Sequence, residues 1–221
     1  MKGTIRFENC MKYSRKFLNL FITVFFLSAT AIADSVDKFV SETIREKKIP
    51  GLSIAVIRDG QVLRAKGYGF ANLELQTPAT KDTVYEIGSI SKQFASEAVM
   101  LLVGEGKLKL DDSITKYLPA NAPEIWKPIT LRQLLNHTSG LKDWTEIKKF
   151  SYRREYSSEE FIDLVRSFPL QFQPNEKWLY SNTNLPLIGI VIDKASGKSF
   201  EDFVTARIIK PLNYPSIRFK H

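Results

Sequence analysis

A serine becomes a nucleophile when a nearby lysine takes its proton, and the pattern S-x-x-K places both side chains on one face of a helix. The chain contains this pattern four times, beginning at Ser35, Ser89, Ser113 and Ser139. Only Ser89 stands before a long apolar segment, where the positive end of a helix dipole would favour its ionised form. We therefore predict Ser89 as the nucleophile and Lys92 as its proton acceptor. The alternative is a serine that caps a helix beside a solvated lysine. Taken alone, the tetrapeptide favours this alternative.

A second candidate cluster is Tyr180-Ser181-Asn182, the only Y-x-N sequence in the chain. A phenol beside a cationic lysine can move a proton, and an asparagine side chain can hold a substrate amide. The alternative is a loop tyrosine that packs on the core, followed by an asparagine that caps a helix.

Patterns for other catalytic chemistries do not occur. The only cysteine is Cys10, and the two histidines are His137 and His221. Neither the nucleophile elbow G-x-S-x-G nor the zinc pattern H-E-x-x-H is present. Gly197-Lys198-Ser199 lacks the glycine that a phosphate-binding loop needs five positions earlier, where Ile192 stands. We therefore expect no metal and no cofactor.

Residues 1–33 have the composition of a secretory signal. Five basic residues precede an apolar run at residues 20–27, and Ala31-Ile32-Ala33 is a small-x-small cleavage pattern. We predict export to the periplasm or the medium, with Met1 or Met11 as the start. An uncleaved N-terminal anchor is the alternative; otherwise membrane contact would occur only through the signal before cleavage.

The predicted mature chain, residues 34–221, carries 27 basic and 23 acidic residues and no cysteine. Because the basic residues are not gathered into a stripe, we expect no nucleic-acid partner. Without disulfides the chain depends on its core, and a chain of this length can bury about 70% of its unfolded surface. No repeat or linker interrupts it, so we predict one domain over residues 34–221.

Hydrophobic spacing and turn residues predict the elements that must position these side chains. The first part should contain a helix, two strands around Asp59-Gly60 and a β-prone stretch, at residues 34–48, 52–57, 62–68 and 83–87. The second part should be helical, at residues 94–103, 131–135, 159–167, 185–195 and 200–209. The first of these helices is apolar nearly all round and should be buried. Thr130 and Ser158 should cap the second and third, and Gly197 should end the fourth.

With these motifs in place, the sequence resembles a known family. Ser89-Ile90-Ser91-Lys92, preceded by Tyr85-Glu86-Ile87-Gly88, resembles the first motif of the serine β-lactamase and penicillin-binding protein superfamily. The segment TLRQLLNHTSGL, from Thr130 to Leu141, is similar to one that recurs in its class C β-lactamase-like group, and Pro211-Leu212 resembles a later stretch. That group also includes D,D-peptidases and esterases. The resemblance extends over residues 36–212.

The resemblance implies a fold and a set of roles. The fold would be α/β of the α+β type, β-lactamase/transpeptidase-like, with an antiparallel sheet flanked by helices and a helical subdomain. Ser89 would be the acylated nucleophile, its N–H would form half of the oxyanion hole, and Lys92 would take or share its proton. Tyr180 would be the general base in acylation and deacylation, and Asn182 would bind the substrate amide. His137 would be structural.

The family's third motif is lysine or histidine, then any residue, then glycine, and it does not occur between Asn182 and His221. We therefore expect the domain to be incomplete at its C-terminus, without its last strands and its second oxyanion donor. Loss of one such donor costs about 10²–10³ in rate. Three explanations of this incomplete domain remain open: a truncated or frameshifted gene, an incomplete gene prediction, and a short pseudoenzyme.

We therefore predict an exported serine hydrolase that forms an acyl-enzyme on an amide or ester. A β-lactam, a D-Ala-type peptide or a small ester is the expected small-molecule or peptide substrate. The absent third motif motivates two alternatives. One is a non-catalytic pseudoenzyme that binds a cell-wall peptide or a partner protein, and the other is a gene remnant without function.

Overall fold

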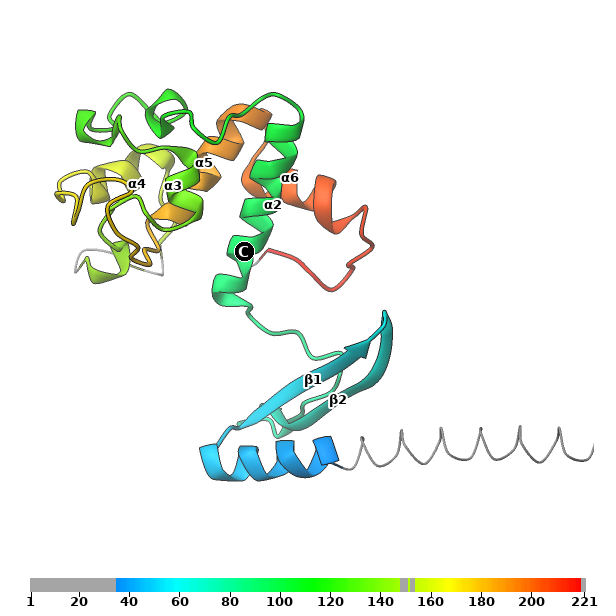
Figure 1. Cartoon of the computed structure of the whole chain (residues 1–221). Helices are drawn as coiled ribbons and strands as arrows, with labels where there is room; N and C mark the ends of the chain where they lie inside the picture. Colours follow the sequence, from blue (N-terminus) through cyan, green and yellow to red (C-terminus); the bar gives the residue numbers. More distant parts are fainter. Residues whose placement is uncertain (1–34, 148–150, 152–153, 220–221) are drawn as a thin grey trace, which may run out of the picture. The chain divides into compact units, whose positions relative to one another are not determined.

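The structure is a computed structural model, and it describes residues 35–147, 151 and 154–219. The predicted signal at residues 1–33 lies outside these ranges. Internal contacts divide the chain into two compact units, residues 1–85 and residues 86–221, and Figure 1 shows the elements of each. Within the described ranges, no helix combines the length and the apolar character that crossing a membrane requires.

The first unit contains a helix over residues 35–47 and a small antiparallel sheet. Its strands are β1 (Gly51–Arg58), β2 (Gln61–Asn72) and the short β3 (Thr77–Pro78), in the order β1-β2-β3. The predicted helix and hairpin are therefore confirmed, with β2 longer than predicted. A register shift between Val56 and Ile57 interrupts the pairing of β1 with β2.

The hairpin turn consists of the two residues that the sequence suggested. Asp59 and Gly60 connect β1 to β2 and have φ values of 50° and 74°. Two consecutive residues with positive φ give the turn a twist that matches that of the flanking strands, which is why Asp-Gly pairs are common there. This local geometry fixes the register in which Arg58 faces Gln61.

The predicted β-prone stretch at residues 83–87 is wrong, because these residues form no strand. A local turn precedes them: Thr80 N–H donates to Thr83 Oγ1 at 2.8 Å, and Thr83 N–H donates to the Thr80 carbonyl at 3.2 Å. Such side-chain bonds compete with a strand ladder for the same backbone groups. Tyr85 is fixed instead through its hydroxyl, which lies 2.9 Å from Ser53 Oγ.

Asp37 attaches the first helix to the hairpin. Its carboxylate accepts hydrogen bonds from Tyr68 and Arg64, and also from Lys66 Nζ at 3.2 Å. The bond from Tyr68, followed by that from Arg64, lowers the pKa of Asp37 from 3.8 to about 2. The folded unit therefore gains stability from this carboxylate above its unfolded pKa, and loses it as the pH falls toward 2.

The second unit is built from helices and short helical turns. Its helices are α2 (Ser91–Gly104), α3 (Leu131–Leu135), α4 (Ser158–Val165), α5 (Asn184–Ser196) and α6 (Phe200–Val204), which continues as a π-helix over Thr205–Ile209. Turns of 3₁₀ helix lie at Gly88–Ile90, Ile114–Lys116, Glu124–Trp126 and Trp144–Glu146. Helix α2 packs against α5 and α6, and α5 also contacts α3 (Figure 1).

Helix α2 turns a face of mostly short side chains to the core. Ala95, Ala98 and Val99 are completely buried, as is Leu102 one turn further on. Because the distance between packed helices depends on the side chains at the contact, short residues let a neighbouring helix lie close. The predicted burial holds for this face only, since Met100 is 48% exposed.

The helix ends largely follow the sequence signals. Thr130 caps α3 in a capping box with Gln133, and Gly197, at φ 72°, ends α5, both as predicted. For α4 the predicted cap is wrong by one residue. Ser157, and not Ser158, accepts the N–H of Glu160, and the Glu160 carboxylate accepts the N–H of Ser157 in return.

The cap at Ser157 predicts that substitutions at two adjacent serines change the free energy of unfolding by different amounts. Ser157→Ala should lower the free energy of unfolding by about 0.5–2 kcal/mol, because it leaves the N–H of Glu160 without its acceptor. The neighbouring variant Ser158→Ala is the matched control and should change it little, since it removes no cap. Urea unfolding followed by circular dichroism measures both. Equal effects of the two variants would contradict the assignment of the cap.

Candidate active site

The Gly88–Ile90 turn presents Ser89 immediately before α2. Ser89 does not cap the helix: the residue at the cap position is Ile90, which makes no side-chain cap bond. Ser91 Oγ instead donates to the Gly88 carbonyl at 2.6 Å and closes the turn. The alternative interpretation of Ser89 as a helix cap is therefore wrong. Ser89 is an exposed residue, and its hydroxyl contacts the side chains of Tyr180 and Lys92.

Ser89 Oγ lies within hydrogen-bond distance of two groups that can exchange protons with it. Tyr180 Oη is 2.7 Å away, although the two residues are 91 positions apart in the chain, and Lys92 Nζ is 3.1 Å away. Lys92 Nζ also donates to Asn182 Oδ1 at 3.0 Å. The structure thus brings together all four residues selected from the sequence as candidate site residues.

Asp143 fixes the orientation of Asn182. Its Oδ2 accepts the backbone N–H of Asn182 at 3.0 Å and the side-chain N–H at 2.9 Å. Because the amide nitrogen is directed to a carboxylate, the amide oxygen must face Lys92. Trp144 Nε1 adds a bond to the Asn182 carbonyl at 3.0 Å. Burial raises the pKa of Asp143, but hydrogen bonds from Asn182 and Thr145 outweigh it and keep the pKa below its usual value.

Asp143 was not among the predicted site residues. It lies two residues beyond the family-like segment that ends at Leu141, and a lone aspartate in a loop follows no catalytic pattern. The only available signal was its place directly after that segment. Its role follows from a contact with Asn182, 39 residues further along the chain.

Buried polar side chains anchor the segment that carries Tyr180 and Asn182. Ser181, Thr183 and Asn184 are each only 1% exposed. Thr183 Oγ1 donates to the Lys142 carbonyl at 2.5 Å and accepts the N–H of Trp144 at 2.9 Å. A buried polar network whose members are all satisfied favours one arrangement over others. The site is therefore held by hydrogen bonds as well as by apolar packing.

The charge of Lys92 alters the acidity of Tyr180. Lys92 Nζ lies 4.9 Å from the centroid of the tyrosine ring. Burial raises the pKa of Tyr180, but its contacts with Lys92 and Ser89 lower it by more, so that the pKa lies below the usual value of 10.0. A phenol of lowered pKa is ionised more often at neutral pH, and its oxygen can then accept the Ser89 proton.

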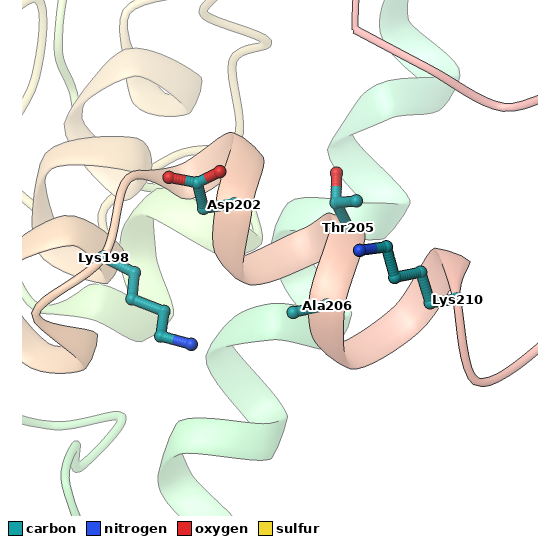
Figure 2. Close-up of a pocket in the computed structure, with 5 residues that line it drawn as sticks. All are labelled: Lys198, Asp202, Thr205, Ala206 and Lys210. Atoms are coloured by element: carbon teal, nitrogen blue, oxygen red, sulfur yellow. The ribbon is translucent and has the colours of Figure 1, made fainter.

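The second unit contains two hollows, and Ser89 lines neither of them. A cavity of about 20 Å³ lies between Lys92, His137 and Asn184 and is too small for a substrate. A wider hollow of about 290 Å³ lies at α6 and the π-helix, where Figure 2 shows its lining residues, Lys198, Asp202, Thr205, Ala206 and Lys210. It shares no residue with the Ser89 cluster. A substrate would therefore reach Ser89 from the exposed side.

No metal centre is formed by the described part of the chain, where no three His, Cys, Asp or Glu side chains gather closely enough to bind an ion. The side chains around Ser89 can take part in proton transfer and nucleophilic attack. A hydroxyl beside a phenol of lowered pKa is the kind of pair in which a base can activate a nucleophile.

Comparisons with known proteins find similar sequences and similar folds. The family model described as Beta-lactamase matches residues 36–221. Protein flp of Staphylococcus aureus (strain N315) is 30% identical over 188 residues, which are 84% of this chain. The solved structure of an octameric penicillin-binding protein homologue from Pyrococcus abyssi has a TM-score of 0.70 and 34% identity over 83% of the chain. A class C β-lactamase in complex with cefoxitin has a TM-score of 0.76 and 26% identity over 87%.

The matches cover only part of each relative. The chain spans 38% of Protein flp, 43% of the Pyrococcus abyssi structure and 52% of the class C enzyme. Within that part, the likenesses confirm the predicted fold class, an α/β architecture of the β-lactamase/transpeptidase type with an antiparallel sheet and helices.

The electrostatics predict how Tyr180 titrates. Lys92→Met should raise the pKa of Tyr180 toward its usual value, because the variant removes the positive charge that favours the phenolate. Lys194→Met, on the exposed side of α5, is the matched control and should leave this titration unchanged. NMR of isotope-labelled tyrosine, with Tyr180 assigned through Tyr180→Phe, gives the titration directly. An unchanged Tyr180 pKa in Lys92→Met would rule out this coupling.

Proposed function

Because the chain belongs to the beta-lactamase family, we propose that it acts as a serine hydrolase that forms an acyl-enzyme at Ser89. The observation that carries the proposal is the double contact of Ser89 Oγ, at 2.7 Å from Tyr180 Oη and 3.1 Å from Lys92 Nζ. A hydroxyl with one partner that donates to it and one that can take its proton is set up for nucleophilic attack.

The proposed acylation step uses each of these contacts. Lys92 donates to Ser89 Oγ, and the proton of Ser89 passes to the Tyr180 oxygen as Oγ attacks the carbonyl carbon. One C–O bond forms, and a tetrahedral intermediate results. When the intermediate collapses, the C–N or C–O bond to the leaving group breaks, and that group takes the proton from Tyr180. The positive charge of Lys92 favours the phenolate that accepts the first proton and that the second transfer restores.

Deacylation repeats the sequence with water in place of Ser89. Tyr180 accepts a proton from water, the resulting hydroxide adds to the acyl carbon, and the ester bond to Ser89 breaks. Ser89 recovers its proton from Tyr180, so that the cycle leaves the protein unchanged. This step requires Tyr180 to remain beside Ser89 after the acyl group has bound.

Asn182 has two roles in this proposal. Its Oδ1 accepts from Lys92 at 3.0 Å and so holds the ammonium beside Ser89. Its side-chain nitrogen donates one N–H to Asp143 at 2.9 Å and carries a second N–H, which we assign to the carbonyl of a substrate amide.

The proposed substrates are small acyl compounds: a β-lactam, a D-Ala-type peptide or a small ester. The exposed position of Ser89 supports a substrate that approaches from solvent. The class C relative is a β-lactamase described in complex with cefoxitin, which supports the β-lactam as the first compound to examine.

The proposal predicts a covalent adduct on one serine. After incubation with a penicillin and, separately, with a fluorophosphonate, the intact mass of the chain should increase by one acyl or phosphonyl group. Ser89→Ala should abolish the adduct because it removes the nucleophile. Ser113→Ala, which changes the serine of another S-x-x-K sequence outside the cluster, is the matched control, and its adduct should persist.

A folded sample without any adduct would contradict the proposed hydrolase. Cooperative thermal unfolding, measured on the same sample, establishes that the protein is folded. Saturable binding of a cell-wall peptide without an adduct would favour the non-catalytic alternative. An adduct that survives in Ser89→Ala would place the nucleophile elsewhere.

A further inference from the structure

His137 contacts the chain on both sides of Tyr180. It lies in the turn after α3, at a φ of 60°. Its carbonyl accepts the N–H of Leu179 at 3.0 Å, and its ring Nδ1 accepts the N–H of Ser181 at 3.2 Å. The residues before and after Tyr180 are therefore both hydrogen-bonded to one histidine.

The imidazole ring of His137 also stacks on the phenol ring itself. The ring centroids of His137 and Tyr180 are 4.6 Å apart with an interplanar angle of 28°. The Trp178 ring packs edge-on against the imidazole, with ring centroids 6.3 Å apart and an interplanar angle of 71°. The stack holds Tyr180 itself, while the two hydrogen bonds hold its neighbours Leu179 and Ser181. A side chain held in this way loses little freedom when it reacts.

The hydrogen-bond network assigns the proton on His137. Asn184 Oδ1 accepts from Ser139 Oγ at 2.9 Å, and Asn184 Nδ2 donates to the Leu134 carbonyl at 3.1 Å. The nitrogen of this amide is therefore the atom that faces His137 Nδ1, at 3.1 Å. Two donors, the Asn184 amide and the Ser181 N–H, point at Nδ1, so Nδ1 carries a lone pair and the neutral ring holds its proton on Nε2.

Charged groups from two other segments face the His137 ring. Burial, followed by the positive charge of Lys92 on α2, lowers the pKa of His137 from 6.5, and Asp143 opposes this. Tyr180 is the third titratable neighbour, and it too lies beside Lys92. A protonated ring would direct an N–H at two existing donors and add a second cation beside Lys92. The arrangement around Tyr180 is thus compatible with the neutral ring only.

We propose that neutral His137 is a positioning residue that holds the Tyr180 phenol against Ser89, and that protonation of His137 releases this hold and slows acylation. The proposal rests on the proposed function for its kinetic consequence. His137 does not touch the reacting atoms: it acts through Tyr180. The expected result is an acid decline in the acylation rate that begins below the pH at which an ordinary histidine titrates, in addition to the decline caused by Tyr180.

His137→Asn is the decisive variant. Asparagine tolerates positive φ, and its Oδ1 can accept hydrogen bonds where Nδ1 does, but it does not titrate. We expect it to acylate Ser89 more slowly than the wild type, because the stack on Tyr180 is lost, and to lose the additional acid decline. His137→Phe keeps a ring for stacking but offers no acceptor, and should slow acylation about tenfold or more at every pH, since two donors lose their partner. His221→Asn, which changes the only other histidine in the sequence, is the matched control and should keep the wild-type profile.

The measurement is the rate of fluorophosphonate labelling of Ser89 against pH, with the thermal unfolding of each variant recorded in the same buffers. A merely structural role for His137 would lower stability without changing the shape of the pH profile. A wild-type profile in His137→Asn would therefore overturn the proposal.

NMR of labelled histidine and tyrosine supplies a readout that needs no catalysis. We expect the proton on Nε2 of His137 and a change in the Tyr180 signal as His137 titrates, and a proton on Nδ1 at neutral pH would overturn the proposal. If Ser89 is never labelled although the Tyr180 signal follows His137, the proposed hydrolase fails and the positioning role stands. If Ser89 is labelled with a profile independent of His137, only the positioning role fails.

Discussion

The contact on which this structure depends is the hydrogen bond between Ser89 Oγ and Tyr180 Oη, 2.7 Å long and spanning 91 residues of sequence. An ordinary serine is a weak nucleophile, and it gains reactivity only where a proton acceptor lies within hydrogen-bond distance. A displacement of one ångström at such a contact can cost a hundredfold in rate. The helical unit therefore has to fix the start of α2 and the loop before α5 relative to each other.

Two features of the helical unit fix α2 and the loop before α5 relative to each other. The short, buried side chains of α2 let it pack closely on α5, which begins two residues after Asn182. The loop itself is attached to the turn after α3 by backbone bonds, such as Asn175 N–H to the Thr138 carbonyl at 2.8 Å. Apolar packing thus fixes the helices, while hydrogen bonds fix the loop that carries the phenol. The hydrogen bonds add the orientation that packing alone leaves open.

Local signals in the sequence were sufficient for elements that form through local interactions. The Asp59-Gly60 turn and the cap at Thr130 depend on their own neighbours, and both were predicted. The stretch at residues 83–87 has the composition of a strand, but the turn bonded through Thr80 and Thr83 precedes it. Composition alone could not reveal that competition.

The candidate site shows the same difference between local signals, which the sequence reveals, and tertiary contacts, which it does not. Ser89 lies in the turn just before α2, which carries Lys92, so their spacing reveals them. Tyr180 and Asn182 stood out as the only Y-x-N sequence, and the resemblance to a family added their roles. Asp143 acts through the orientation of an amide 39 residues away, and no spacing in the sequence records such a contact. His137 stood within the family-like segment as a structural residue, but its stack on Tyr180 is a tertiary contact. Residues that work through other residues were thus the ones that sequence reasoning missed or undervalued.

The central claim is that Lys92 and Tyr180 act on Ser89 as one unit, and a double-mutant cycle tests it most directly. The quantity is the rate at which a fluorophosphonate labels Ser89 in the wild type, Lys92→Met, Tyr180→Phe and the double variant. Each single change should slow labelling by about 10²–10⁴, and the double variant should be little slower than the slower single one, because residues that act as a unit are not additive. A double variant whose loss equals the product of the two single losses would show that they act independently and would contradict the account.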